Sequence, residues 1–364
     1  MHVLQSFKDY FPPTVGGVEN HIHQIVNNME GVDFTVLTSS RSRRTVRENL
    51  DGVEVIRAAE YLRPASTPIM PSWRGYLKEL QVDLMHAHMP NPFGEICLLV
   101  TDTAPVVATY HADIVGRPLL ARAFAPIQQG FFRRASTIVV SSARLADSAP
   151  SLALHHDKVQ IVPFGVDASR WAARPGAADE IRESHPGPLV LFLGRLVHYK
   201  GLDILVKAMA DVDATCLVVG NGPKRQVTQE LVGSMDLGKK VLLLGPVPDS
   251  ERSAYYHAAD VFVLPSTNRA EAYGISMLEA MACGTPAIST EVGTATSLLN
   301  QHRVTGLVVE PGKPAELAKA IRELLADASL RAELGAAAAE RVKTGFSQKR
   351  MLQLLRQVYE DAVS

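Results

Sequence analysis

The sequence predicts an α/β protein built from two doubly wound domains, each with a parallel sheet. Short apolar, β-branched runs alternate with segments of helical length, and several runs lack the polar alternation of a half-exposed strand. The alternation is interrupted once, by a stretch rich in proline and glycine between Val166 and Pro188. A length of 364 residues also favours two domains.

Each predicted strand is one of these apolar runs. In the first half they are His2–Gln5, Phe34–Thr38, Val53–Arg57, Leu84–His88, Val106–Tyr110, Ile138–Ser141 and Val159–Val162. In the second half they are Leu189–Leu193, Cys216–Val219, Val241–Leu244, Val261–Leu264, Ala287–Ser289 and Leu307–Val309. We expect one domain over residues 1–167, a second over 168–345, and a helix within 346–364 that packs back towards the first.

Composition excludes several classes of protein. Net charge is −1, from 37 basic and 38 acidic residues, so no global charge favours nucleic acid as a partner. The three cysteines, Cys97, Cys216 and Cys283, each lie in an apolar run, which favours buried thiols and a reducing cytoplasm. No signal-peptide pattern is visible, and no apolar stretch reaches the ~18 residues that span a bilayer.

The most informative segment runs from Glu271 to Glu279, after the strand Val261–Leu264. A helix is expected to begin near Gly274, and its first free N–H groups favour a phosphate. Those groups belong to Gly274, Ile275, Ser276 and Met277, with Tyr273 directly before them. Glu271 and Glu279 would contact different parts of one elongated ligand. The alternative is a capping charge and a solvated helical residue, but the small residues that follow Glu279 are unusual beside a solvated face.

Two cations follow the strand Leu189–Leu193. Arg195 and Lys200 would emerge at the carboxyl end of that strand, where they can hold a diphosphate; the alternative is a basic loop before a helix. Gly220 and Gly222 follow the next strand, and Val247 lies in the turn Gly245–Pro248 after the one beyond. Both of these turns are candidates for the wall of a nucleotide cleft or simple tight turns.

The first half carries fewer candidates. Gly16 and Gly17, between the first strand and the first helix, permit close approach of a ligand to the backbone, or serve only as a flexible joint. His111 and Asp113 follow the strand Val106–Tyr110 and are candidates for contact with a substrate. Asp211 and Asp213 match a metal-binding pattern, but they precede a strand, so we interpret them as a polar turn.

A membrane surface is a further candidate partner. The segment Arg117 to Arg134 mixes four arginines with apolar residues, among them Leu119, Leu120, Phe124, Ile127, Phe131 and Phe132. Arg41, Arg43, Arg44 and Arg47 form a second basic cluster. Such segments favour contact with an anionic membrane, whereas apolar residues in a core and solvated arginines are the alternative.

These motifs resemble the retaining glycosyltransferases of family four, which have the GT-B fold. Glu271 and Glu279 match the Glu-x7-Glu motif of that family, and the sequence from Pro265 to Pro286 is similar to that of family members throughout. The resemblance implies two Rossmann-like domains facing a central cleft. It also implies that Glu271 faces the donor sugar and that Glu279 binds the ribose hydroxyls.

The remaining site roles come from the same resemblance. Arg195 and Lys200 would stabilise the leaving diphosphate, and backbone near Val247 would hold the nucleobase. Gly16 and Gly17 would reach towards the donor, and His111 would contact the reacting sugar, with Asp113 orienting it or meeting the acceptor. We expect the second domain to bind the nucleotide-sugar donor and the first to bind the acceptor.

The expected activity is retaining transfer of a hexose from a nucleotide-diphosphate sugar to a glycan, lipid-linked or small-molecule acceptor, with no metal and no other cofactor. GDP-mannose is the favoured donor because the segments from Asn268 and from Glu291 are similar to mannosyl- and rhamnosyltransferases. UDP-glucose and UDP-N-acetylglucosamine remain open, as do a sugar-nucleotide 2-epimerase and a non-catalytic binder. A nicotinamide-dependent oxidoreductase is disfavoured, since the first loop lacks G-x-G-x-x-G.

We expect a cytoplasmic protein, with peripheral contact at the inner face of the membrane as the further hypothesis.

Overall fold

The computed structural model describes residues 1–14, 16–112 and 118–364 and divides into two compact units. Unit 1 comprises Met1–Phe164 and Met351–Ser364, and unit 2 comprises Gly165–Arg350. Residues 165–167 therefore lie in unit 2, although the sequence analysis placed them in the first domain. Backbone pairing explains this, because Val166 donates to Phe346 O over 3.0 Å and accepts from Gln348 N over 3.0 Å.

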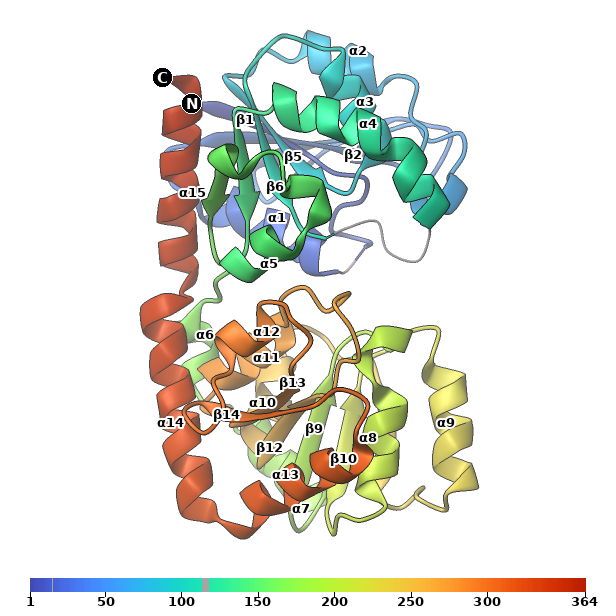
Figure 1. Ribbon diagram of the computed structural model, residues 1–364, viewed down its shortest axis with the longest axis vertical. Helices are drawn as coiled ribbons and strands as arrows, with labels where there is room; N and C mark the ends of the chain where they lie inside the picture. Colours follow the sequence, from blue (N-terminus) through green and yellow to red (C-terminus); the bar gives the residue numbers. More distant parts are fainter. Residues whose placement is uncertain (15, 113–117) are drawn as a thin grey trace. The chain divides into compact units, whose positions relative to one another are not determined.

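Unit 1 contains an eight-stranded sheet in the order β3-β4-β2-β1-β5-β6-β7-β8 (Figure 1). The strands are β1 His2–Ser6, β2 Asp33–Ser39, β3 Val46–Leu50, β4 Val53–Ala58, β5 Leu84–Met89, β6 Val106–Tyr110, β7 Thr137–Val140 and β8 Val159–Ile161. All neighbours are parallel except β3 and β4. The sequence analysis missed β3, because its residues are mainly polar and it forms the edge of the sheet.

Helices cover both faces of this sheet. They are α1 Gly17–Asn28, α2 Trp73–Glu79, α3 Pro92–Leu99, α4 Pro118–Arg134, α5 Ala143–Ser148 and α15 Gln348–Val363, with short 3-10 turns η1 Pro64–Ser66, η2 Pro150–Leu152 and η3 His156–Lys158. Apolar residues of α2, α3 and α4 form one core with the strands. The opposite face carries the polar side chains that matter below, beginning with Gln5 and His86.

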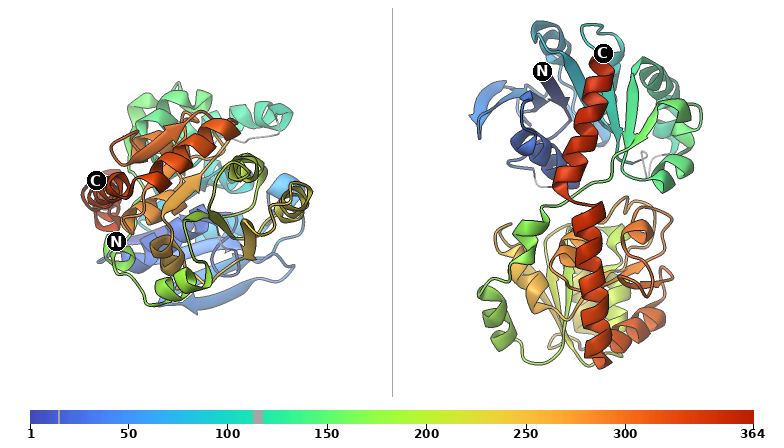
Figure 2. Two further views of the ribbon diagram at one scale, coloured as in Figure 1. Left: turned by 90° about the horizontal axis from the view of Figure 1, so that it is seen from below. Right: turned by 90° about the vertical axis from the view of Figure 1, so that its left-hand side faces the viewer.

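The C-terminal helix α15 contributes to unit 1 (Figure 2). It buries Met351, Leu355, Val358 and Tyr359, which recur at helical spacing on one face. Arg356 also donates to Glu30 O over 2.9 Å. The last residues of the chain thus complete the unit that the first residues begin.

Unit 2 contains a six-stranded, wholly parallel sheet in the order β11-β10-β9-β12-β13-β14. The strands are β9 Leu189–Leu193, β10 Thr215–Val219, β11 Val241–Gly245, β12 Val261–Leu264, β13 Ala287–Thr290 and β14 Gly306–Val309. The helices are α6 Ala168–Ala172, α7 Ala177–Ser184, η4 His198–Lys200, α8 Leu202–Met209, α9 Arg225–Ser234, α10 Arg252–Ala258, α11 Ile275–Ala282, α12 Thr296–Leu299, α13 Pro314–Ala326 and α14 Ala328–Gly345. The predicted fold class, two Rossmann-like α/β domains with parallel sheets, is confirmed.

The cysteines are all free thiols. Cys97 and Cys216 are buried, as expected, but Cys283 at the end of α11 is partly exposed. Burial raises the pKa of the Cys97 thiol to about 11 and that of Cys216 to about 12, so both are protonated at neutral pH.

Candidate functional site

A buried ion pair lies beyond the carboxyl ends of β9 and β12. The Lys200 ammonium is 2.5 Å from Glu271 Oε2, and the two side chains are only 10% and 7% exposed. Lys200 ends η4, and the next residue, Gly201, has a φ of 68°. A Cβ at Gly201 would lie 2.0 Å from Pro265 O, so the absence of a side chain lets this turn press against the loop that carries Glu271.

Further contacts fix the Glu271 carboxylate. Ser266 Oγ donates to Glu271 Oε2 over 3.0 Å, and Thr294 Oγ1 donates to the Glu271 carbonyl over 2.7 Å. Glu271 Oε2 therefore holds both a cation and a hydroxyl. Since the acid is deeply buried, removal of Lys200 would leave an uncompensated charge.

Arg195 differs from Lys200 in its environment. Its side chain is exposed, and it makes no hydrogen bond or ion pair with any residue in the described ranges. Both cations follow β9, as predicted, but one is held by an acid and the other is free to meet an anion from solvent.

The helix α11 begins as the sequence predicts, at Ile275 after the N-cap Gly274. Gly274 has a φ of 91°, and its carbonyl accepts from the N–H groups of Met277 and Leu278. The N–H groups of Ile275 and Ser276 donate to no atom within the part of the chain that the structure describes. These free donors and the positive end of the helix dipole favour an anion here. Tyr273 is buried directly before them.

Glu279 lies one turn further into α11, at the centre of a second charged cluster. Its Oε2 accepts from Tyr256 Oη over 2.7 Å and from Arg252 Nη2. Burial raises the pKa of the Glu279 carboxyl, although the Arg252 guanidinium opposes that shift. Burial also raises the pKa of Tyr256 well above 10, so this phenol donates its hydrogen.

Several charged and aromatic side chains lie around Arg252. It pairs with Asp249 Oδ1 at 2.6 Å, and Arg170 pairs with Asp249 Oδ2 at 2.6 Å. The guanidinium groups of Arg170 and Arg252 lie 5.0 Å and 5.7 Å from the Trp171 ring centroid. Sequence reasoning missed Arg252 and Tyr256. One available signal was an arginine close behind the strand Val241–Leu244, at the start of a helix.

Gly220 and Gly222 are explained by packing between two loops. A Cβ on Gly220 would lie 1.9 Å from Gly194 O, and a Cβ on Gly222 would lie 2.4 Å from Leu196 O. The absence of side chains at these two positions therefore brings the second loop against the Arg195 loop. Val247 is half-buried in the neighbouring turn.

In unit 1, the glycine pair stands at the start of α1. Gly17 is the first helical residue and Gly16 is its N-cap. A Cβ on Gly16 would lie 2.3 Å from Glu19 Oε2, the end of a flexible side chain. The pair thus gives the Glu19 carboxylate room beside the first turn of the helix.

His111 belongs to a buried cluster of four histidines, with His21, His86 and His88. His88 Nδ1 lies 3.0 Å from His111 Nε2, and the two rings are stacked with centroids 5.2 Å apart. The His21 ring meets both edge-on, at 5.9 Å from His88 and 5.8 Å from His111. Of these four histidines, the sequence analysis assigned a role to His111 alone.

Burial keeps this cluster uncharged. It lowers the pKa of His21 and of His86 to about 3, and those of His88 and His111 well below 6.5. Neighbouring imidazoles lower the last three further, because two adjacent imidazolium ions would repel each other. The cluster is therefore neutral at physiological pH.

Asp113 lies outside the described residues. Asp211 and Asp213 are exposed before β10, as expected for a polar turn. Within residues 1–14, 16–112 and 118–364, no group of three or more His, Cys, Asp or Glu side chains could hold a metal ion.

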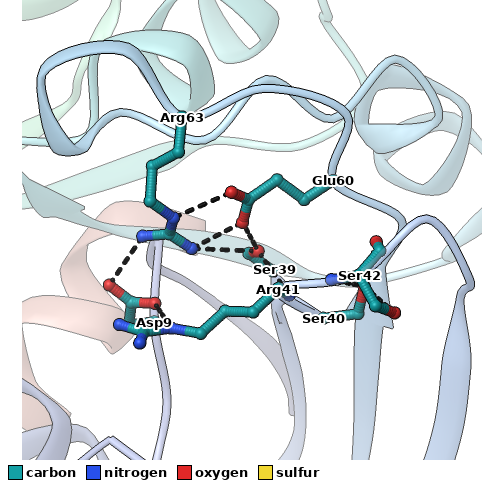
Figure 3. Close-up of polar contacts among 7 residues, drawn as sticks. All are labelled: Asp9, Ser39, Ser40, Arg41, Ser42, Glu60 and Arg63. Atoms are coloured by element: carbon teal, nitrogen blue, oxygen red, sulfur yellow. Dashed lines mark hydrogen bonds and ion pairs between the residues drawn. The ribbon is translucent and has the colours of Figure 1, made fainter.

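Two of the four arginines in the basic cluster after β2, Arg41 and Arg47, pair with acids, and Figure 3 shows the contacts around Arg41. Asp9 binds Arg41 at 3.0 Å and Arg63 at 3.1 Å, and Arg63 also reaches Glu60 at 2.6 Å. Arg47 pairs with Glu79 at 2.9 Å. Asp9 and Arg41 are among the residues that line a cavity of about 60 Å³. These pairs reduce the positive charge that the cluster could offer to a membrane.

The apolar residues of α4 differ in exposure, and Phe124 and Ile127 are half-buried. Phe131 and Phe132 are fully buried in the core, whereas Leu119 and Leu120 are 82% and 53% exposed. The predicted surface is therefore confined to the first turns of this helix. In the described ranges, no helix has the length and the apolar composition to cross a bilayer.

Comparison with known proteins agrees with this arrangement. Residues 177–341 match the family model "Glycosyl transferases group 1", and residues 15–170 match "Glycosyltransferase Family 4". A D-rhamnosyltransferase of Pseudomonas aeruginosa is 33% identical, over 95% of this chain and 92% of its own. The O-antigen chain mannosyltransferase C of Escherichia coli is 31% identical, over 89% and 88%. The structure of a sucrose-phosphate synthase from Thermosynechococcus elongatus superposes with a TM-score of 0.84 at 22% identity, over 99% and 98%.

Proposed function

Since this chain belongs to the family-four glycosyltransferases with the GT-B fold, we propose that it is a retaining hexosyltransferase that moves mannose from GDP-mannose to a hydroxyl acceptor. The acceptor in this proposal is a glycan, a lipid-linked molecule or a small molecule. Unit 2 binds the donor and unit 1 binds the acceptor. No metal takes part.

The observation that carries the proposal is the Lys200–Glu271 pair beside the open N-terminus of α11. A buried ion pair is costly to assemble, and it holds an ammonium in a defined place. The free N–H donors of Ile275 and Ser276 closely follow Glu271 in the chain. A diphosphate bound at Ile275 and Ser276 would also meet the exposed Arg195. Two cations and two amide hydrogens match the charge that develops on a departing nucleoside diphosphate.

The proposed chemistry follows from this placement. As the glycosidic bond breaks, negative charge grows on the phosphate, and Lys200 and Arg195 stabilise it more strongly than they stabilise the intact donor. The acceptor hydroxyl attacks from the same face, and the departing phosphate oxygen takes its proton, so the configuration is retained. Glu271 holds Lys200 in this scheme and is not assigned as a nucleophile. His111 contacts the reacting sugar.

Glu279 binds the ribose hydroxyls of the donor in this proposal. Arg252 and Tyr256 donate to Oε2, and among the described residues no donor reaches Oε1. The carboxylate is thus fixed on one side and keeps an acceptor for a hydroxyl on the other.

The experiment incubates the purified protein with GDP-mannose, UDP-glucose and UDP-N-acetylglucosamine in turn. We expect GDP-mannose to give the largest thermal shift and a slow donor hydrolysis that EDTA leaves intact. Release of the α-anomer would support retention, and release of the β-anomer would contradict it. Conversion of a UDP-sugar to its 2-epimer without an acceptor would instead favour an epimerase. A loss of activity in EDTA that manganese restores would contradict the metal-independent mechanism.

A peripheral membrane contact is part of the same proposal. Leu119 and Leu120 project from the first turns of α4, and the exposed Arg122 lies in the next turn. Apolar side chains beside a cation suit an anionic bilayer surface. We assign the protein to the cytoplasm, at the inner face of the membrane when it meets a lipid-linked acceptor.

A further inference from the structure

Unit 1 buries a continuous chain of polar side chains that ends at His111. His86 Nε2 lies 2.6 Å from Thr109 Oγ1, and His86 Nδ1 lies 2.7 Å from Tyr359 Oη. Gln5 Nε2 donates to Tyr359 Oη over 2.9 Å. Gln5 Oε1 lies 2.8 Å from His88 Nε2, and the chain then reaches His111.

Hydrogen positions along this chain depend on one another. A neutral imidazole has one donor and one acceptor, so a hydrogen bond at one ring nitrogen fixes the role of the other. Gln5 Oε1 can only accept, which places the hydrogen of His88 on Nε2. His88 Nδ1 must then accept, which places the hydrogen of His111 on Nε2.

We propose that Gln5, acting through His88, holds His111 in the tautomer that presents a lone pair on Nδ1. Within the described ranges no residue donates to His111 Nδ1. That nitrogen therefore accepts a hydrogen bond from a hydroxyl of the bound sugar. This last step rests on the proposed function, in which His111 contacts the reacting sugar. Gln5 and His88 are positioning residues in this scheme.

Tyr359 fixes the orientation of the Gln5 amide. Burial raises the pKa of this phenol, so Tyr359 keeps its hydrogen. Because the Tyr359 oxygen accepts from Gln5 Nε2, its own hydrogen goes to the other neighbour, His86 Nδ1. If the amide turned over, each hydrogen along Gln5, His88 and His111 would reverse, and His111 Nδ1 would become a donor. The C-terminal helix thereby sets the chemistry of a residue that lies more than two hundred positions earlier in the chain.

The test uses Gln5→Leu, and Tyr359→Phe as a second variant that conserves shape. In protein labelled with nitrogen-15 in histidine, the His111 resonances, identified by their loss in His111→Asn, report which nitrogen carries the hydrogen. We expect Nδ1 to be unprotonated in the parent chain. In Gln5→Leu the tautomer ratio should shift by about 2- to 10-fold, the worth of one hydrogen bond, with a similar fall in kcat and an unchanged KM for the donor.

A matched control exists in the same unit. Gln129 bridges His155 Nε2 at 2.8 Å and Ser151 O at 2.7 Å, and is not connected to the chain that ends at His111. Gln129→Leu should lower stability and leave the His111 resonances and kcat unchanged. The proposal is overturned if His111 keeps its tautomer in both Gln5→Leu and Tyr359→Phe, or if kcat falls no further in them than in Gln129→Leu. If the parent chain transfers no sugar, the proposed function fails, and the nitrogen resonances still decide whether Gln5 sets the tautomer.

Discussion

The two units differ in the kind of polar side chain that they bury near their candidate site residues. Each buries a cluster of polar side chains. Around its candidate site residue His111, unit 1 buries neutral groups, four imidazoles with an amide and a phenol, whereas around its own candidate residues unit 2 buries ion pairs, Lys200 with Glu271 and Arg252 with Glu279. The difference matches the ligands that we propose. Fixed charges suit a diphosphate, and neutral donors and acceptors suit the hydroxyls of a sugar.

The largest expected effect is acid unfolding of unit 1. The folded pKa values of its four buried histidines lie below the unfolded value of 6.5, so the unfolded chain binds more protons as pH falls and stability is lost. Glu95 acts in the other direction, because burial raises its pKa to about 7 and its protonation adds stability as pH falls. The net uptake of about three protons costs about 4 kcal/mol per pH unit below pH 6.5.

The chain offers a probe for each unit, because it has two tryptophans, Trp73 in unit 1 and Trp171 in unit 2. In Trp171→Phe, emission from Trp73 should shift to longer wavelength between about pH 5 and pH 3, where unit 1 exhausts a typical stability of about 5–15 kcal/mol. In Trp73→Phe, emission from Trp171 should change only at lower pH. If the emission of both tryptophans changes at the same pH, the two units do not differ in acid stability as we expect.

The second effect tests the charged unit. Lys200→Ala should reduce kcat by about 10²- to 10³-fold, because it removes a cation that stabilises charge in the transition state. Steady-state assays at saturating donor measure this, and Trp171 emission checks that unit 2 remains folded despite the unpaired Glu271.

The matched control is Arg182, which pairs with Asp260 at 2.8 Å in the same unit. Arg182→Ala should lower the thermal midpoint and leave kcat unchanged. Unlike Lys200 and Glu271, the Arg182–Asp260 pair does not lie beyond the carboxyl end of a strand that contributes to the candidate site. An equal fall in kcat in both variants would mean that Lys200 acts only through stability.

The third effect concerns nucleotide affinity. Glu279→Gln should weaken binding of GDP by about 10- to 100-fold, the usual value of a charge-assisted hydrogen bond, as measured by calorimetry. Glu251→Gln, an exposed change of the same charge at the N-cap of α10, should have no effect. Equal affinities for all three chains would remove Glu279 from the donor site.

The sequence alone predicted those strands and helix ends that depend on residues close to them in the chain. Thirteen strands follow from apolar runs, and the start of α11 follows from Gly274 and its neighbours. The edge strand β3 was missed because Arg47, Glu48 and Asn49 conceal its periodicity. Proline and glycine between Val166 and Pro188 suggested a connection, yet the segment also contains α6 and α7.

Long-range partners could not be predicted. Gln5 and Tyr359 form a hydrogen bond across 354 positions, and nothing near either residue signals the other. Arg252 of α10 reaches Glu279 of α11 only after these two helices have packed together. Glycines at 220 and 222 were candidates for a ligand wall or for tight turns, and the sequence did not indicate that the backbone carbonyls of another loop lie beside them. Motifs therefore identified the residues that would meet a ligand, and not those that hold them in place.

The smallest effect compares the surfaces of the two units. Leu119→Ser with Leu120→Ser in unit 1 should weaken binding to vesicles of anionic lipid by about 3- to 10-fold, since partial burial of two leucines is lost. Val227, which is 55% exposed on α9 of unit 2, provides the control, and Val227→Ser should bind vesicles like the parent chain. All these changes should alter the free energy of unfolding by less than about 0.5 kcal/mol, because the side chains are exposed. Vesicle sedimentation measures the first effect and urea titration the second. If the leucine variant and the valine variant bind equally well, the first turns of α4 do not meet a membrane, and the contrast between the units is confined to their interiors.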